Sequence, residues 1–287
     1  MKLLIHWDME GVSGLFKREQ VWFWEPDVTA EDAAAGRDLL MADVDALSEA
    51  VLAAGVDELI VCDTHHGGGN LDLERMLKDP RITYIQPTGY EDGRRRWLPG
   101  LDGSVDAIFL PGHHAKAGTP GAFMHHTWSA DWADFRINGQ SVGEMGIEAC
   151  FAGHWGVPIA FVQGDEATCA EAREQFPWAV AACVKRAVSY GRAEGLAPAA
   201  ARRLTAEKAA EAVERIRRGD ARPFQPGLPM TVTVRLNSPE AAARALSRPG
   251  IWARPVDDCT LEGRVERRAD VVKWLIGTGL DMPERRR

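Results

Sequence analysis

Near the start of the sequence stands the apolar run Lys2-Leu3-Leu4-Ile5-His6-Trp7, followed directly by Asp8-Met9-Glu10-Gly11. A short apolar run that ends at such a polar segment predicts a buried strand leading into a loop. Helical periodicity follows over residues 30–54, and Gly55 stands where a helix C-cap glycine belongs. Residues 58–62 predict a second buried strand. A strand-helix-strand unit of this kind builds a parallel sheet.

The rest of the chain extends this pattern and then changes character. Further strands are expected at residues 82–86, 107–110 and 158–162, a hairpin at 135–142 and helices at 143–153 and 166–176. Beyond an amphipathic helix at 197–218 the order becomes strand, helix, strand, helix, at residues 230–236, 239–246, 259–267 and 270–277. We therefore expect an α/β fold with a mostly parallel sheet flanked by helices. We assign residues 1–195 to a metal-binding catalytic domain and residues 196–287 to a smaller α+β domain.

Composition and charge narrow the class of protein. The chain has 287 residues, of which 45% are hydrophobic and 26% charged, as in ordinary globular proteins. The net charge of -8 argues against a nucleic acid or an anionic membrane as partner. No targeting segment and no membrane-spanning run is visible. The five cysteines are scattered and form no CxxC pair, so they indicate reduced cysteines in a cytoplasmic protein.

Residues of the kind that bind metals follow successive predicted strands. Asp8 and Glu10 come after the first strand, Asp63 and His65 after the second, His113-His114 after the strand at 107–110, and Glu144 begins a helix. In open α/β sheets the ligand sites lie outside the carboxyl ends of the strands. Residues far apart in the sequence are therefore expected to meet in one cleft.

The histidines support a metal site but do not show which member of each adjacent pair faces it. Six of the eight occur in the doublets His65-His66, His113-His114 and His125-His126. Adjacent residues of an extended segment point to opposite sides, so one member of each doublet at most should face the cleft. Three carboxylates with two imidazoles suit zinc first, with manganese or cobalt as alternatives.

One carboxylate can bridge two ions about 3.5–4 Å apart. Asp8 is the best candidate for that bridge, because a short side chain at a strand end is held firmly. Each residue also has an ordinary structural explanation, such as a turn cap for Asp8 or the favourable charge at a helix start for Glu144. Those explanations do not account together for ligand-type residues at several successive strand ends.

In their order along the chain these motifs resemble the D-aminopeptidase family of zinc metallopeptidases. The matching pieces are Asp8-Met9-Glu10-Gly11-Val12-Ser13-Gly14, Asp63-Thr64-His65, Gly112-His113-His114-Ala115, Gly118-Thr119-Pro120-Gly121, His126-Thr127, and Ile137-Asn138-Gly139 leading to Val142-Gly143-Glu144. The resemblance is specific from residue 1 to about residue 165. Beyond that it rests on length and layout.

The resemblance implies two zinc ions per chain, bridged by Asp8. Glu10 and His65 would complete one site, and His114 and Glu144 the other. It also implies a catalytic histidine, which maps to His126 because a threonine follows it, with His125 as the alternative. The family forms ring-shaped decamers, and the ten tryptophans of this chain also favour a homo-oligomer.

The function expected from sequence is therefore metal-dependent release of amino-terminal, D-configured residues from short peptides or amides. A two-metal phosphoesterase, a non-peptide amidase and a metal-dependent peptide-binding protein without turnover are the alternatives. The aromatic segment at residues 21–26 has three possible roles, a lid over the substrate, an oligomer contact or ordinary packing.

Overall fold

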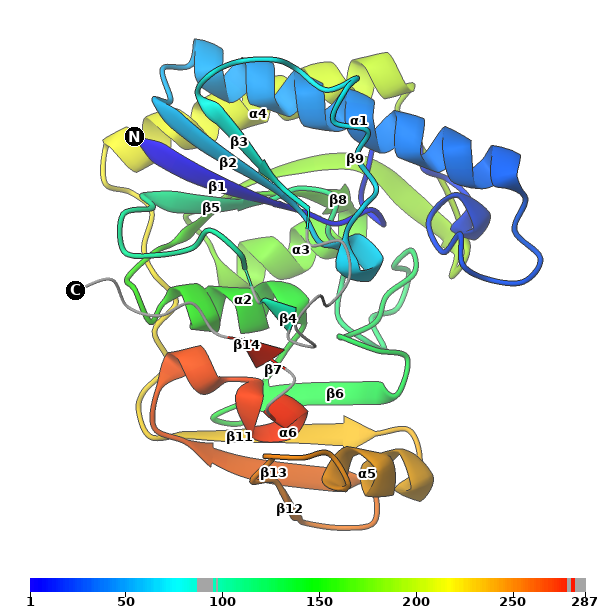
Figure 1. Cartoon of the computed structure of the whole chain (residues 1–287), viewed down its shortest axis with the longest axis vertical. Coiled ribbons are helices and arrows are strands. Elements are labelled where there is room, and N and C mark those ends of the chain that lie inside the picture. The colour runs from blue at the N-terminus through cyan, green and yellow to red at the C-terminus, as the bar shows by residue number, and fades with distance from the viewer. Residues whose placement is uncertain (87–94, 97, 278–279, 282–287) are drawn as a thin grey trace.

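A central sheet organises the fold in the computed structural model, which describes residues 1–86, 95–96, 98–277 and 280–281. Its strands lie in the order β10-β9-β8-β5-β1-β2-β3 (Figure 1). Their bounds are β1 Lys2–Trp7, β2 Glu58–Asp63, β3 Ile82–Ile85, β5 Ala107–Leu110, β8 Ile159–Asp165, β9 Val180–Ser189 and β10 Arg192–Gly195. All neighbours pair in parallel except β10, which is antiparallel to β9. The expected mostly parallel sheet is confirmed.

Helices cover both faces of this sheet. Helix α1 (Ala30–Ala53) packs beside α4 (Pro198–Arg217) on one face, and α2 (Glu144–Ala152) and α3 (Glu166–Gln175) lie on the other (Figure 1). Thr29 caps α1, because its side chain accepts a hydrogen bond from the backbone N–H of Asp32. None of the described helices is both long and apolar enough to cross a bilayer.

A second, antiparallel sheet lies beyond α2, with the strand order β12-β13-β11-β6-β7 (Figure 1). Its strands are β6 Trp132–Ile137, β7 Gln140–Val142, β11 Met230–Leu236, β12 Arg254–Pro255 and β13 Thr260–Val265. The remaining short elements are β4 Arg95–Arg96, which pairs with β14 Leu280–Asp281, the helices α5 Pro239–Leu246 and α6 Lys273–Ile276, and the 3-10 turns Arg18–Gln20, His65–Gly67 and Arg268–Asp270.

The chain passes between these layers more than once. The hairpin β6–β7 belongs to the first half of the sequence, yet β6 pairs with β11 from the second half. Helix α4 lies after residue 195, yet it packs against α1, β8 and β9 of the central sheet. The division of the chain between residues 195 and 196 stays a prediction.

Strand β1 shows how side-chain alternation divides the core. Leu3, Ile5 and Trp7 pack in the cluster that includes α1 and α4. Leu4, between them, packs in the other cluster with α2 and the second sheet. His6 therefore points towards α2, because side chains two residues apart in a strand share a face. This places a buried polar side chain directly behind the end of the strand.

Most predicted elements are present within a residue or two of the expected bounds, but β9 and β10 were not predicted. β9 contains Ala181, Ala182, Cys183 and Lys185, and alanine and lysine have low strand propensity. Lys185 is nevertheless buried, and its ammonium donates to the carbonyls of Val12 and Leu15 at 3.0 and 2.7 Å. Tertiary contacts, not local propensity, make this segment a strand.

Two glycines allow the loops after β1 and β5 to touch. The Gly11 N–H donates to the Gly112 carbonyl at 2.6 Å. Gly112 has a φ of +74°, and a Cβ at this position would overlap the backbone carbonyl of Asp8. A side chain at residue 112 would therefore push apart the segments that contain Asp8 and His114.

We expect Gly112→Ala to destabilise the protein beyond the cost of its backbone conformation. The left-handed conformation alone costs an alanine about 1–2 kcal/mol, and overpacking adds about 1–3 kcal/mol. Gly156→Ala is the matched control, because Gly156 has a φ of +78° and no atom within 4 Å of a built Cβ. Denaturant unfolding measures both variants. Equal losses in the two would show that close packing at Gly112 is unimportant.

Candidate metal centre

The ends of three neighbouring parallel strands bring the predicted ligands together. β1 lies between β5 and β2, and Asp8 and Glu10, His65 and His114 follow these strands at the same edge. His65 Nδ1 lies 2.7 Å from Asp8 Oδ1 and 3.5 Å from Glu10 Oε2. His114 Nε2 lies 3.5 Å from Asp8 Oδ2. Asp8 and His114 thus share one site although they are 106 positions apart in the sequence.

Glu144 completes this group from the other side. It is the first residue of α2, and its Oε1 lies 3.3 Å from His114 Nε2. His126 is adjacent, with Nε2 at 3.6 Å from the same oxygen and its ring stacked on His114 at 3.9 Å between centroids. Asp8, Glu10 and His114 form one set of donors within 4.8 Å of one another, and His114, His126 and Glu144 form another.

Backbone carbonyls fix which ring nitrogen of each histidine faces the carboxylates. His65 Nε2 lies 3.1 Å from the Val21 carbonyl, and His114 Nδ1 lies 3.0 Å from the Ala115 carbonyl. A carbonyl only accepts, so these nitrogens are the N–H donors. The opposite nitrogens, His65 Nδ1 and His114 Nε2, then point at the carboxylates. This is the usual arrangement of histidines that ligate a metal.

The pKa shifts of the site residues show that the carboxylates stabilise positive charge among them. Burial opposes ionisation of Asp8, but interactions with His114 and His65 outweigh it and hold the pKa of Asp8 well below its usual range. Burial likewise disfavours charged imidazoles, yet Glu10 and Asp8 raise the pKa of His65 well above 6.5. Glu144 and Asp8 do the same for the pKa of His114. Without a metal, protons on these histidines balance the carboxylates.

Two buried atoms support a metal ion in place of those protons. Glu10 Oε2 and His114 Nε2 make no hydrogen bond to any residue that the structure describes. Their neighbours are ion-pair contacts only, Glu10 Oε2 with His65 and His114 Nε2 with Asp8 and Glu144. Carboxylate oxygens and imidazole nitrogens at these separations match the ligand set of a zinc-type divalent ion. The residues present therefore fit such an ion.

Comparison with known proteins identifies the family of this chain. The family model described as D-aminopeptidase matches residues 1–276. The chain belongs to the D-aminopeptidase family. A D-aminopeptidase of Bacillus subtilis (strain 168) is 32% identical over 221 residues, which are 75% of this chain and 74% of that protein. The solved structure of the Zn-dependent D-aminopeptidase DppA from Bacillus subtilis, a self-compartmentalizing protease, matches with a TM-score of 0.85 and 26% identity over 96% of each chain.

The structure separates the two members of each histidine doublet. In each pair one ring lies at the carboxylates and the other elsewhere. His66 stacks on Trp24 at 3.7 Å between centroids, and His113 Nε2 lies 3.0 Å from Glu148. His125 accepts a hydrogen bond from the Gly118 N–H at 3.1 Å and contacts Tyr190.

The sequence did not predict several residues that support the site. The Trp22 indole N–H donates to Glu10 Oε1 at 2.9 Å, and its ring meets the edge of His126. Asp165 caps α3 and also accepts from the Phe123 N–H at 2.7 Å, which anchors the loop before His126. The aromatic run around Trp22 was the only available indication of these contacts, and it did not specify a partner.

Asp63, two residues before His65, ends β2 and is fully buried. Its two carboxylate oxygens accept from the backbone and side-chain N–H groups of Asn70 at 2.7 and 2.9 Å. The Asn70 side chain also donates to the His65 carbonyl at 2.9 Å. Asp63 therefore holds the loop that contains His65 through Asn70.

We expect the metal-free protein to lose stability as pH rises above about 6.5. A group whose pKa is raised on folding stabilises the fold fully below its unfolded pKa, and that contribution disappears as pH rises through the folded pKa. His65 and His114 are such groups, with an ordinary value of 6.5. Asp8 and Glu144, whose pKa values are lowered, act in the opposite sense, so their contribution is lost as pH falls below about 4.

Thermal unfolding of chelator-treated protein between pH 5 and 9 measures this effect. His65→Gln should reduce the loss of stability at high pH, and His66→Gln, one residue away, should not. In metal-loaded protein the metal's stabilising effect should grow with pH, since ligand imidazoles must be neutral. Metal-free protein that is equally stable at pH 6 and pH 8 would contradict this account.

Proposed function

We propose that this chain is a zinc-dependent aminopeptidase that releases amino-terminal D-amino acids from short peptides or amides. The observation that supports this most strongly is the meeting of Asp8, Glu10, His65, His114 and Glu144 at one sheet edge, in a member of the D-aminopeptidase family. The similar Bacillus subtilis protein of known structure is described as Zn-dependent. Family membership favours peptide hydrolysis over phosphoester cleavage, non-peptide amide hydrolysis or binding without turnover.

We further propose two ions per chain, because Asp8 divides the donors into two sets. Its Oδ1 faces His65, which also neighbours Glu10, and its Oδ2 faces His114, which also neighbours Glu144. One carboxylate with each oxygen directed at a different set of ligands is suited to bridge two ions. Glu10 with His65 would hold one zinc ion, and His114 with Glu144 the other.

When bound, the zinc ions lower the pKa of water towards about 7 and polarise the scissile carbonyl. We assign proton transfer to His126, which lies beside His114 and Glu144. Its Nδ1 lies 2.9 Å from the Met124 carbonyl, which only accepts, so Nδ1 holds the hydrogen. Nε2, which lies 3.6 Å from Glu144 Oε1, is therefore the nitrogen that can accept a proton at the site. It can take the proton of the attacking water and return it to the amine as the carbon–nitrogen bond breaks.

We expect His126→Ala to retain both metal ions and to lose about 10²–10⁴ in kcat toward D-amino-acid amides or dipeptides. His125→Ala is the matched control and should remain within a few-fold of wild type, because its ring is held against Tyr190. Asp8→Ala should bind neither ion. Metal analysis and steady-state kinetics on the same preparations measure all three.

Other outcomes separate the parts of this proposal. Metal loss in His126→Ala would make His126 a ligand, which its place beside His114 and Glu144 would permit. Full activity in that variant would remove its catalytic role. A wild-type protein that cleaves phosphate esters and no amide would exclude the peptidase while leaving the metal site intact.

We also propose a homo-oligomer, specifically a ring-shaped decamer. The similar Bacillus subtilis protease is described as self-compartmentalizing, which requires several copies to enclose a space. Light scattering should therefore give a solution mass near ten times the 31.5 kDa of one chain. A monomer at micromolar concentration would exclude this assembly. Cytoplasmic localisation stays a prediction from the sequence.

A further inference from the structure

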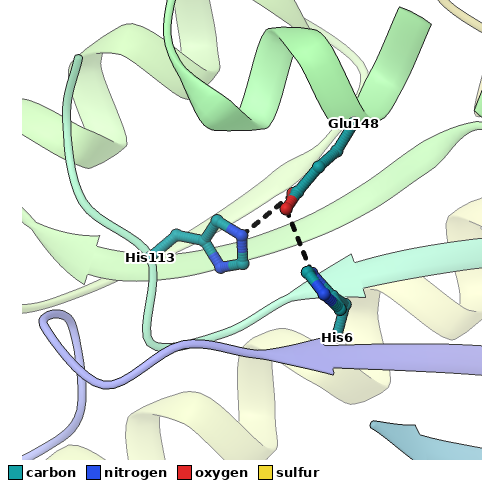
Figure 2. A group of neighbouring side chains, drawn as sticks. All are labelled: His6, His113 and Glu148. Carbon is teal, nitrogen blue, oxygen red and sulfur yellow. Dashed lines mark hydrogen bonds and ion pairs between the residues drawn. The ribbon is translucent and has the colours of Figure 1, made fainter. Parts of the chain in front are cut away.

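A second polar cluster lies directly beneath the metal centre, in the interior. It consists of His6, His113 and Glu148, whose exposed fractions are 5%, 1% and 1%. Figure 2 shows the two imidazoles on either side of the Glu148 carboxylate, which projects from α2. The proposed reaction uses none of these side chains. Burying polar and charged side chains nevertheless costs free energy, so their presence in the interior needs a structural or functional reason.

Every member of the cluster has a polar partner within it, through hydrogen bonds or an ion-pair contact. Glu148 directs one carboxylate oxygen at His6 Nδ1, at 3.1 Å, and the other at His113 Nε2, at 3.0 Å. The outer nitrogens are also occupied. His6 Nε2 lies 2.6 Å from the Thr64 hydroxyl, and His113 Nδ1 lies 3.2 Å from the Pro111 carbonyl. The result is a continuous chain of polar contacts from Thr64 through His6 and Glu148 to His113, in which the link between His6 and Glu148 is an ion-pair contact.

This chain joins the four segments that contain the metal ligands. His6 precedes Asp8 by two residues, Thr64 precedes His65 by one, and His113 precedes His114 by one. Glu148 follows Glu144 by four residues, which is about one turn of α2. Each ligand-bearing segment thus contributes one member. A displacement of any segment relative to the others would stretch these hydrogen bonds.

We propose that Thr64, His6, Glu148 and His113 form a positioning network that sets the relative placement of the metal-ligand segments. They would act through the ligands and touch neither metal nor substrate. The inference rests on the proposed function, because the ligand set belongs to that proposal. It assigns a role to His113 and Glu148, which sequence analysis left without one.

A third metal ion in this cluster is the main alternative, since its donor atoms lie within 4.8 Å of one another. Two neutral imidazoles and one carboxylate would leave a divalent ion with a net charge of +1. That charge would be fully buried, next to a site proposed to hold two further cations, and such burial is strongly unfavourable. In the network His113 donates from Nδ1 to the Pro111 carbonyl and from Nε2 to Glu148, so the ring holds one positive charge that balances the single carboxylate. No net charge is then left in the interior, and the geometry favours the network.

The test compares two replacements of Glu148 that have similar shape. Glu148→Met cannot hydrogen-bond to the imidazoles. Glu148→Gln can bond to both, because its carbonyl can accept from His6 and its amide can donate to His113 Nε2, whose Nδ1 already donates to Pro111. Ile147→Val, at the neighbouring fully buried position of α2, controls for a general disturbance of the core. The probe is Co²⁺ bound in place of zinc.

We expect Glu148→Met to shift the visible absorption bands of the Co²⁺-loaded protein. Its Co²⁺ affinity in chelator competition should fall about 10–100-fold, as when outer contacts of metal ligands are removed. Its kcat should fall by a similar factor, with KM changed less. Glu148→Gln should remain within a few-fold of wild type with an unshifted spectrum, and so should Ile147→Val.

Thr64→Val provides a second variant in case Glu148→Met does not fold, because it removes one hydroxyl at nearly constant volume. It should shift the spectrum in the same direction and by less. A wild-type spectrum and affinity in both Glu148→Met and Thr64→Val would overturn the proposal. So would an additional metal ion that both Glu148 variants lose. The Co²⁺ spectrum and the Co²⁺ affinity are measured without substrate. They therefore test the network even if the protein proves not to be a peptidase.

Discussion

The rest of this structure depends on one interaction. It is the attraction between a group of carboxylates and the positive charge that they surround. Asp8, Glu10 and Glu144 lie within a few ångströms of two buried imidazoles. An unpaired buried charge costs several kcal/mol, whereas the net stability of a whole domain is only about 5–15 kcal/mol. The fold is therefore compatible with this group of acids only when cations, either protons on histidine or metal ions, lie among them.

The parallel sheet brings these groups together because the carboxyl ends of its strands share an edge. Close approach at that edge then requires small residues, and Gly11 and Gly112 allow the two loops to form a backbone hydrogen bond. Helix α2 contributes Glu144 from the opposite side, through the hairpin that belongs to the second sheet. The site thus depends on both sheets.

Sequence patterns predicted the parts of the fold that have a strong local cause. The apolar runs of β1, β2 and β5 and the Asn138-Gly139 turn gave elements close to those observed, with φ values of +50° and +82° at the turn. β9 was missed because its alanines and Lys185 favour a strand only through contacts with β8 and the loop after β1. The five ligand-type residues could be selected from the sequence because each follows a strand or begins a helix, and the structure brings them together.

The contacts between residues distant in sequence could not be predicted in the same way. No sequence pattern links Trp22 to Glu10, or Glu148 to His6, because each pair is defined only when the strands and α2 pack. Glu148 had no distinguishing feature in the sequence, since a glutamate within a helix is usually exposed. Its burial between two histidines becomes visible only in three dimensions.

Side chains alternate in direction along an extended segment, and this alternation explains why His113 and His114 have different surroundings. His114 faces the carboxylates at the cleft, so its neighbour must face the opposite way, into the interior. His6, two residues before Asp8, and Glu148, one helical turn after Glu144, are directed inward by the same strand and helix periodicities. The geometry that places each proposed ligand at the sheet edge therefore also fixes a nearby inward position. His6 and Glu148 thus share a face with the proposed ligands Asp8 and Glu144, whereas His113 faces away from His114. In this chain these positions hold polar side chains that contact one another, so the network lies beneath the proposed ligand set.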